Sequence, residues 1–278
     1  MTTKIGIIGL GLMGGSLSLA LKKTSENYYF VGLDHNKAHC AEALSLGLVD
    51  EIVQTLEAIK ECDILILTIP VDAIISVARQ LGSLHEKCTV IDLGSTKEKI
   101  SESIPENIRK NFVTAHPMTG TEKFGPGAAI DDLYEGKVVV LCDMEKSGEH
   151  QQKIAKKLFS DIKMTLVFMG AKEHDRHAAF ISHMPHALSY ALANAVMKQE
   201  DPESIVALAG GGFRDMSRIA KSSPQMWEDI FRQNQTNLIE AIEAFETELK
   251  ECRHMVENEA WEKLNRWMAQ ANTLHDIL

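Results

Sequence analysis

The sequence has no excess of positive charge and no long apolar run. Its formal net charge of -10 at pH 7 argues against sequence-independent binding to nucleic acid, because such binding draws its affinity from Lys and Arg. No stretch approaches the roughly 18 consecutive apolar residues of a membrane span, and the apolar run after Lys4 is too short for a signal-peptide core. We therefore expect a soluble protein that acts on small molecules, with neither nucleic acid nor a membrane as partner.

Paired cysteines are also lacking. The five cysteines are odd in number and form no C-x-x-C motif, so we expect neither a disulfide framework nor a zinc cluster. This pattern fits a protein of the reducing cytoplasm and predicts no metal site.

Up to about residue 170, short apolar runs alternate with amphipathic stretches. Such alternation predicts parallel strands joined by crossover helices. The expected strands are Lys4–Gly9, Tyr28–Leu33, Ile64–Ile69, Thr89–Leu93, Phe112–Ala115, Lys137–Leu141 and Thr165–Phe168. The expected helices between them include Gly14–Lys23, Lys37–Leu46 and Val71–Leu81.

Beyond Gly170 the apolar residues recur at helical spacing. We therefore predict an α/β fold with two domains: a Rossmann-like, doubly wound and mostly parallel sheet over residues 1–169, and an all-α domain over residues 170–278. The charged stretch Glu243–Glu262 is interpreted as the solvated face of long helices, although its apolar stripe could serve a partner subunit. A helical domain this small often gains core by packing against its own copy, which predicts a homodimer.

Gly9, Gly11 and Gly14 form a G-x-G-x-x-G motif between an expected strand and an expected helix. In such a turn the first glycine permits the tight bend, and the second lets a pyrophosphate approach the backbone. The third lets the helix pack close to the strand, and the helix N-terminus supplies free amides. We therefore predict a dinucleotide site on this turn, with Leu12 and Met13 as part of it.

Asp34 closes the second expected strand, twenty residues beyond Gly14. An acidic side chain there accepts hydrogen bonds from the adenosine ribose hydroxyls and favours NAD as cofactor, while Lys37 leaves residual use of NADP open. The alternative is that Asp34 caps the next helix. Thr68 and Pro70 end the following strand at the edge where open sheets bind ligands, and we add them to the predicted cofactor site.

Two further polar residues follow strands of the same sheet. Ser95 comes after the strand Thr89–Leu93 and is expected near the nicotinamide, or alternatively as a cap of the helix that begins near Lys97. His116 opens a segment that is too polar and turn-rich for a core element. A lone histidine beside a turn is usually structural, but near a nicotinamide it can accept a hydroxyl proton as hydride leaves the same carbon.

Five segments resemble the prephenate and arogenate dehydrogenases of tyrosine biosynthesis, closest to their monofunctional bacterial members. They are Gly9–Ser16 (GLGLMGGS), Asp92–Lys97 (DLGSTK), His116–Glu122 (HPMTGTE), Ile181–His186 (ISHMPH) and Gly210–Ala220 (GGGFRDMSRIA), the last followed by Ser223–Trp227 (SPQMW). The resemblance implies the NAD-dependent oxidative decarboxylation of prephenate to 4-hydroxyphenylpyruvate. In this reaction the C4 hydroxyl is oxidised, the ring carboxylate leaves as carbon dioxide, and aromatisation is the driving force.

The resemblance also implies roles for individual residues. His116 matches the catalytic histidine that hydrogen-bonds the C4 hydroxyl, and Ser95 matches the serine that orients both groups. Substrate binding is assigned to Arg218, His186, Thr121, Glu122, Arg214, Asp215, Trp227 and His183. Arg218 suits a carboxylate because its planar guanidinium can donate two parallel hydrogen bonds. Trp227 is expected from the neighbouring subunit of a dimer, and the role of His183 stays open.

Other functions remain open at this point. An arogenate or dual cyclohexadienyl dehydrogenase acts on a substrate that carries an amino group in place of the keto group, and Glu122 is a candidate for choosing between the two. More remote alternatives are a β-hydroxyacid dehydrogenase and a protein that binds NAD without catalysis.

Overall fold

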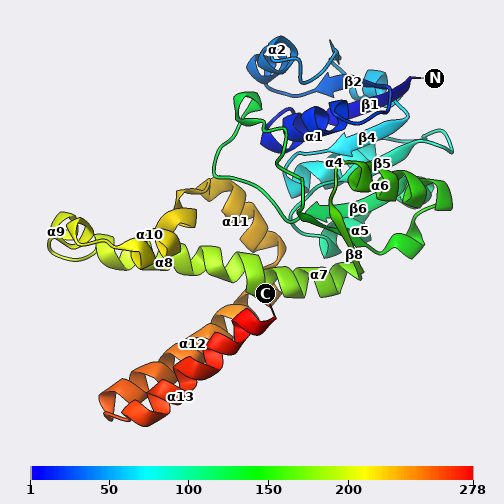
Figure 1. Cartoon of the computed structure of the whole chain (residues 1–278). Helices are drawn as coiled ribbons and strands as arrows, with labels where there is room; N and C mark the ends of the chain where they lie inside the picture. The colour runs from blue at the N-terminus through cyan, green and yellow to red at the C-terminus, as the bar shows by residue number, and fades with distance from the viewer. Residues whose placement is uncertain (1, 278) are drawn as a thin grey trace. The chain divides into compact units, whose positions relative to one another are not determined.

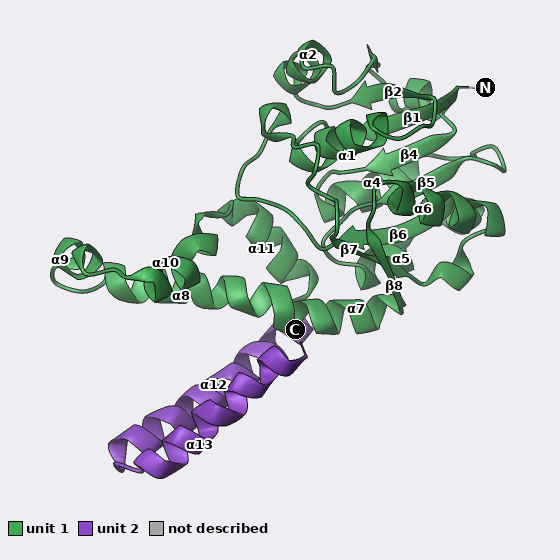
Figure 2. Ribbon diagram, in the orientation of Figure 1, with its two compact units in different colours: residues 1–234 green, residues 235–278 purple. Residues whose placement is uncertain are grey.

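The computed structural model describes residues 2–277. The chain forms two compact units, residues 1–234 and residues 235–278 (Figure 2). The sheet ends at Met169 and every regular element after it is helical. The expected division into domains of residues 1–169 and 170–278 stays a prediction.

The first unit contains one eight-stranded sheet with the strand order β3-β2-β1-β4-β5-β6-β7-β8 (Figure 1). Its strands are β1 Thr3–Ile8, β2 Tyr28–Leu33, β3 Glu51–Ile52, β4 Ile64–Leu67, β5 Thr89–Asp92, β6 Phe112–Pro117, β7 Val138–Cys142 and β8 Thr165–Met169. All neighbouring strands are parallel except β6 and β7. The predicted doubly wound, mostly parallel sheet is thereby confirmed. The sequence pattern missed β3, because two residues are too few to carry a periodic signal.

Helices cover both faces of this sheet (Figure 1). They are α1 Leu12–Lys22, α2 Lys37–Ser45, α3 Leu56–Ile59, α4 Val71–Gln80, α5 Glu98–Ser103 and α6 Glu149–Asp161, with the short 3-10 turns Glu106–Asn111, Pro126–Ala128 and Met144–Lys146. Consecutive residues of the central strand β4 point to opposite faces of the sheet and belong to different hydrophobic cores. Ile66 packs with α1 and α6, and Leu67 packs with α4 and α5. Because both faces are buried, the strands read as continuous apolar runs in the sequence.

Beyond the sheet the first unit is helical, as predicted. Its elements are α7 Ala171–Ala178, the π-helical turn η4 Ala179–His183, α8 Met184–Met197, α9 Pro202–Ala207, α10 Gly211–Ser217, the 3-10 turn η5 Arg218–Lys221 and α11 Pro224–Gln233. In Figure 1, α8 runs away from the sheet and α11 returns toward it. Arg232 of α11 forms an ion pair with Asp72 of α4 at 2.9 Å, which ties the returning helix to the nucleotide half.

The second unit is a hairpin of α12 Gln235–Glu257 and α13 Trp261–Asn272, with a final 3-10 turn Thr273–Asp276. Trp267 Nε1 donates to Glu248 Oε2 at 2.8 Å and joins the two helices. Leu249 and Trp261 are exposed, and α13 buries none of its described residues. Within residues 2–277, no helix is both long and apolar enough to cross a membrane.

Candidate active site

The glycine turn lies between β1 and α1, and its three glycines have three different surroundings. Gly9 has a φ of +99°, and a Cβ there would lie 2.6 Å from Thr68 O. A Cβ on Gly14 would lie 2.3 Å from Gly9 O, so helix and strand pack too closely for a side chain. A Cβ on Gly11 would meet nothing within 4 Å. The turn is therefore built tightly at its ends and left open at its centre, where α1 begins without a side-chain cap.

This open centre fits the pyrophosphate of a dinucleotide. A helix N-terminus offers unpaired amides and a partial positive charge to an anion. Leu12 is buried, and Met13 O accepts a hydrogen bond from Tyr134 Oη at 2.8 Å, so both residues also anchor α1. The predicted cofactor contacts of these two residues remain predictions.

Asp34 lies at the end of β2 with its carboxylate facing the glycine turn. Its Oδ2 accepts from Leu10 N at 2.8 Å, and its Oδ1 accepts from Asn36 N at 2.8 Å. The alternative role of a cap for α2 is wrong, because the side chain of Asn36 caps that helix. Each carboxylate oxygen keeps a further lone pair, so the position still suits a ribose hydroxyl.

Thr68 and Pro70 lie at the end of β4, beside the same turn. Thr68 Oγ1 donates to Gly9 O at 2.6 Å, so this hydroxyl holds the first glycine in place. Pro70 is the residue before the first turn of α4. Both residues are placed as the sequence predicts, and their contacts with a cofactor stay predictions.

Ser95 is half-buried in the loop between β5 and α5. The first helical residue of α5 is Glu98, and the amides of Lys97 and Glu98 donate to the carboxylate of Asp175 at 2.7 and 2.9 Å. The alternative role of Ser95 as the cap of this helix is therefore wrong. No hydrogen bond joins Ser95 to His116 among the described residues, so its orienting role stays a prediction.

His116 lies on β6, near the carboxyl end of the neighbouring strand β5. Its Nδ1 lies 2.9 Å from His174 Nε2. Burial, helped by the nearby His174 and Lys97, holds the pKa of His116 well below its usual value. The ring is therefore neutral at physiological pH, with one nitrogen bound inside the protein and Nε2 as the remaining nitrogen.

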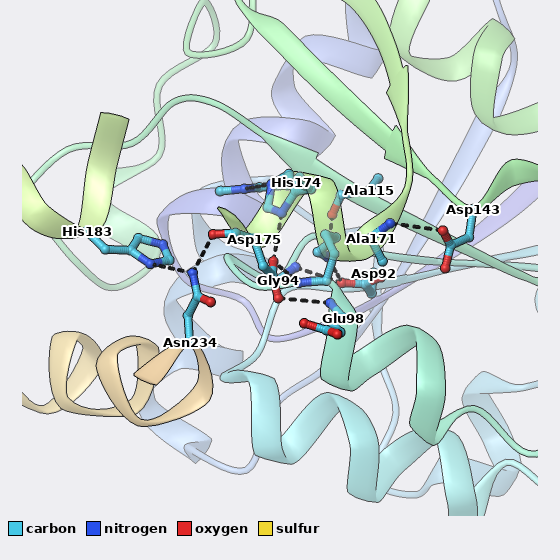
Figure 3. Close-up of polar contacts among 12 residues, drawn as sticks. Asp92, Gly94, Glu98, Ala115, Asp143, Ala171, His174, Asp175, His183 and Asn234 are labelled. Atoms are coloured by element: carbon cyan, nitrogen blue, oxygen red, sulfur yellow. Dashed lines mark hydrogen bonds and ion pairs between the residues drawn. The ribbon is translucent and has the colours of Figure 1, made fainter. Parts of the chain in front are cut away.

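Three polar residues of this site escaped the sequence analysis. His174 and Asp175 of α7 are each 2% exposed, and Asn234 at the end of α11 is 3% exposed. His174 Nδ1 lies 2.8 Å from Asp175 Oδ1, and Asn234 Nδ2 donates to Asp175 O at 2.6 Å (Figure 3). In the sequence these residues look like the polar face of amphipathic helices. Only the packing of the helices against the sheet buries them.

A buried ion pair lies next to the strand residue that precedes His116. Lys97 and Asp92 are both fully buried and form an ion pair. Burial raises the pKa of Asp92, and the Lys97 ammonium opposes that rise. Lys97 Nζ also donates to Ala115 O at 2.7 Å, which ties the loop after β5 to the residue before His116. Lys97 stands in the segment DLGSTK, but that segment gave no sign of this role.

The two histidines predicted to bind substrate, His183 and His186, both contact Trp227. His186 stacks on Trp227 with ring centroids 3.6 Å apart, and its Nδ1 donates to Ser182 O at 2.9 Å. His183 is buried, with a pKa that burial lowers to about 4, and its Nδ1 lies 3.1 Å from Asn234 Nδ2. The nitrogens His183 Nε2 and Trp227 Nε1 are buried without a hydrogen-bond partner among the described residues.

Trp227 thus reaches the site from the same chain, and a contribution from a neighbouring subunit stays a prediction. Arg218 is exposed at the start of η5. Burial lowers the pKa of His186, and the nearby charge of Arg218 lowers it further. Asn234 Nδ2 contacts both Asp175 O and His183 Nδ1, at 2.6 and 3.1 Å, so hydrogen bonds connect the surroundings of His116 with His183. That Arg218 and the other predicted substrate residues form one site with His116 stays a prediction.

The other predicted substrate residues are exposed or half-exposed. Arg214 and Asp215 are exposed on α10, and Arg214 Nε donates to Ala209 O at 3.2 Å. Glu122 is exposed, and Thr121 Oγ1 accepts from Lys123 N at 3.2 Å. None of the four bonds to His116 in the described part of the chain, so their roles remain predictions.

Comparison with known proteins gives matches along the whole chain. Two family models match: "Prephenate dehydrogenase, nucleotide-binding domain" over residues 17–168 and "Prephenate dehydrogenase, dimerization domain" over residues 170–270. The prephenate dehydrogenase of Bacillus subtilis (strain 168) is 32% identical over 284 residues, covering 100% of this chain and 76% of the relative.

Solved structures are similar over the same length. The crystal structure of prephenate dehydrogenase from A. aeolicus, in complex with hydroxyphenyl propionate and NAD+, has 34% identity and a TM-score of 0.92, covering 98% of this chain and 97% of that one. The crystal structure of Synechocystis arogenate dehydrogenase has 28% identity and a TM-score of 0.81, covering 99% of both chains.

The two family models together cover most of the chain, on both sides of Gly170. The first family model spans Asp34, Ser95 and His116, and the second spans His186 and Arg218. The chain therefore belongs to the prephenate dehydrogenase family.

Proposed function

We propose that the protein catalyses the oxidative decarboxylation of prephenate to 4-hydroxyphenylpyruvate with NAD as the oxidant. The observation that carries the proposal is the half-buried His116, whose pKa is held well below its usual value, at the same sheet edge as the glycine turn. A neutral imidazole there can take a hydroxyl proton at physiological pH. Membership of the family supplies the substrate class.

The cofactor site is proposed to be the open centre of the glycine turn. Gly11 leaves the space for the pyrophosphate, the N-terminus of α1 supplies amides, and Asp34 accepts from the adenosine ribose. NAD, when bound, accepts the hydride from C4 of the substrate. The protein supplies positioning and electrostatic complementarity.

His116 is proposed to act on the C4 hydroxyl. As the hydride leaves C4, Nε2 of His116 accepts the hydroxyl proton and the C4–O bond becomes a carbonyl. The bond from the ring to its carboxylate then breaks, carbon dioxide leaves, and the electron pair of that bond aromatises the ring. His116 returns its proton to the phenolate oxygen, so the reaction releases no net proton. Ser95 is proposed to orient the hydroxyl.

Arg218 is proposed to hold a substrate carboxylate, with His186 beside it. The guanidinium is exposed and lies near His186, and a planar guanidinium can bind a carboxylate with two hydrogen bonds. Thr121, Glu122, Arg214, Asp215, His183 and Trp227 complete the proposed substrate site.

The active form is proposed to be a homodimer assembled through the helical half, in the cytoplasm. Among the described residues of α8, α9 and α10, only Ser189 is buried, which leaves these helices short of a core of their own. The second family model describes this half as a dimerization domain. The five unpaired cysteines are compatible with a reducing compartment.

The direct test is turnover by the purified protein with NAD and each of prephenate, arogenate and a panel of β-hydroxyacids. We expect NADH and 4-hydroxyphenylpyruvate from prephenate, with a higher kcat/KM than for arogenate. Turnover with arogenate alone, or with hydroxyacids alone, would overturn the proposal. NAD binding without any turnover would support the non-catalytic alternative instead.

A further inference from the structure

Two buried side chains of α7, Asp175 and His174, lead to the half-buried ring of His116. The carboxylate of Asp175 meets Nδ1 of His174 at 2.8 Å, and Nε2 of His174 meets Nδ1 of His116 at 2.9 Å. Both α7 residues are almost fully buried. The proposed reaction does not use His174 or Asp175, so the burial of these two polar side chains beside His116 needs a reason.

The chemistry of these groups fixes where the hydrogens lie. A carboxylate only accepts hydrogen bonds, so Nδ1 of His174 carries a hydrogen toward Asp175. In the neutral ring Nε2 of His174 is then an acceptor, and Nδ1 of His116 must donate to it. The opposite arrangement would turn a lone pair of His174 toward the carboxylate. Nε2 of His116 therefore keeps the lone pair that a base needs.

We propose that His174 and Asp175 are positioning residues that fix the tautomer and the orientation of His116, and that they stabilise its imidazolium form during turnover. The inference rests on the proposed function, since it assigns His116 the part of a base. A carboxylate behind a histidine acts in this way in hydrolytic triads, where it does not itself become protonated. Here a second histidine stands between the two.

Asp175 also connects His116 with the loop that carries Ser95. Its two oxygens accept from Lys97 N and Glu98 N, directly after that loop. The same carboxylate thus positions both groups that are proposed to contact the C4 hydroxyl. Its own position is fixed by Asn234, which donates to its backbone oxygen.

Four variants test the inference. Asp175→Asn removes the negative charge and replaces one of the two acceptor oxygens by a donor, and His174→Phe removes the relay. His174→Gln keeps one acceptor and one donor on a side chain of similar length. The control is Asp143→Asn. Asp143 anchors the start of α7 by accepting from Ala171 N at 2.9 Å, and asparagine tolerates its left-handed φ of 47°.

We expect Asp175→Asn and His174→Phe to lower kcat about 100-fold or more, with little change in KM for prephenate or NAD. His174→Gln should recover part of that loss, and Asp143→Asn should keep a near wild-type kcat. With prephenate deuterated at C4, the isotope effect on kcat should rise in the two impaired variants, because proton transfer and hydride transfer then limit the rate.

The tautomer is measured directly by ¹⁵N NMR of the histidine-labelled protein, with the His116 signals assigned from the spectrum of His116→Asn. We expect an unprotonated Nε2 in the wild type and a mixture of tautomers in Asp175→Asn. A wild-type His116 protonated at Nε2 overturns the inference, as does unchanged kcat in folded Asp175→Asn. If Asp175→Asn does not fold, the comparison of His174→Gln with His174→Phe decides. Absence of prephenate turnover in the wild type refutes only the proposed function, since the tautomer is read in the free protein.

Discussion

Lys97 donates a hydrogen bond to the carbonyl oxygen of Ala115, so the loop with Ser95 is fixed to the residue before His116. The same ammonium is paired with Asp92, and both side chains are fully buried. Breaking a buried pair by removing one partner leaves an uncompensated charge in the interior. The ion pair therefore links the stability of the sheet to the geometry of the site.

Lys97→Met should consequently lower the free energy of unfolding by about 3–5 kcal/mol. Urea denaturation at pH 7 measures it. The matched control is Lys250→Met, since Lys250 forms an exposed pair with Glu246 on α12 and should change stability by less than about 1 kcal/mol. Equal effects of the two substitutions would contradict this account of Lys97.

The pH dependence of activity should follow from the lowered pKa of His116. The charged and titratable groups that face it are His174 and Asp175 of α7, Lys97 of the β5–α5 loop and His183 of η4. Because the neutral form is the base, kcat/KM should stay level as the pH falls through about 6.5, the ordinary value for histidine, and should decline only at lower pH. A decline centred at or above that value in a pH-rate profile would show that the ring is not held neutral.

His116→Asn should keep near-normal binding of NAD and prephenate and lower kcat by about two to four orders of magnitude, the usual contribution of a positioned base. Isothermal titration and steady-state kinetics separate the two effects. A large loss of NAD affinity with unchanged kcat would place His116 in the cofactor site instead.

The sheet and the glycine turn could be predicted from the sequence because both depend on local patterns. Apolar runs predict buried strands, and the G-x-G-x-x-G spacing is itself a short local motif. Gly14 is required by its contact with Gly9, five positions away, whereas the contact of Gly9 with Thr68 comes from the packing of β1 against β4. The environment of His116 depends on tertiary packing. His174 lies 58 positions away in the sequence on a helix with no distinguishing pattern, and Asn234 reaches Asp175 only because α11 returns to the sheet. Such contacts produce no periodic pattern in the sequence.

Arg218→Lys should raise KM for prephenate about tenfold or more, because an ammonium keeps the charge but loses the two-pronged grip on a carboxylate. Affinity for NAD should be unchanged. Arg253→Lys on α12 is the control, since that arginine is exposed and pairs with Glu257. If KM rises equally in both variants, Arg218 does not contact the substrate.

Gly11 and Gly14 should respond to the same substitution in opposite ways. Gly14→Ala places a methyl group 2.3 Å from the backbone oxygen of Gly9. The helix and the strand can make room for it only with strain, so the free energy of unfolding should fall by about 1–3 kcal/mol or more. Gly11 has a φ of -81° and open space around its Cβ position, so Gly11→Ala should fold normally. Its methyl group occupies the proposed pyrophosphate position, and NAD affinity measured by fluorescence titration should fall at least tenfold, or about 1.4 kcal/mol. Unchanged affinity in Gly11→Ala would show that the pyrophosphate does not approach the backbone there.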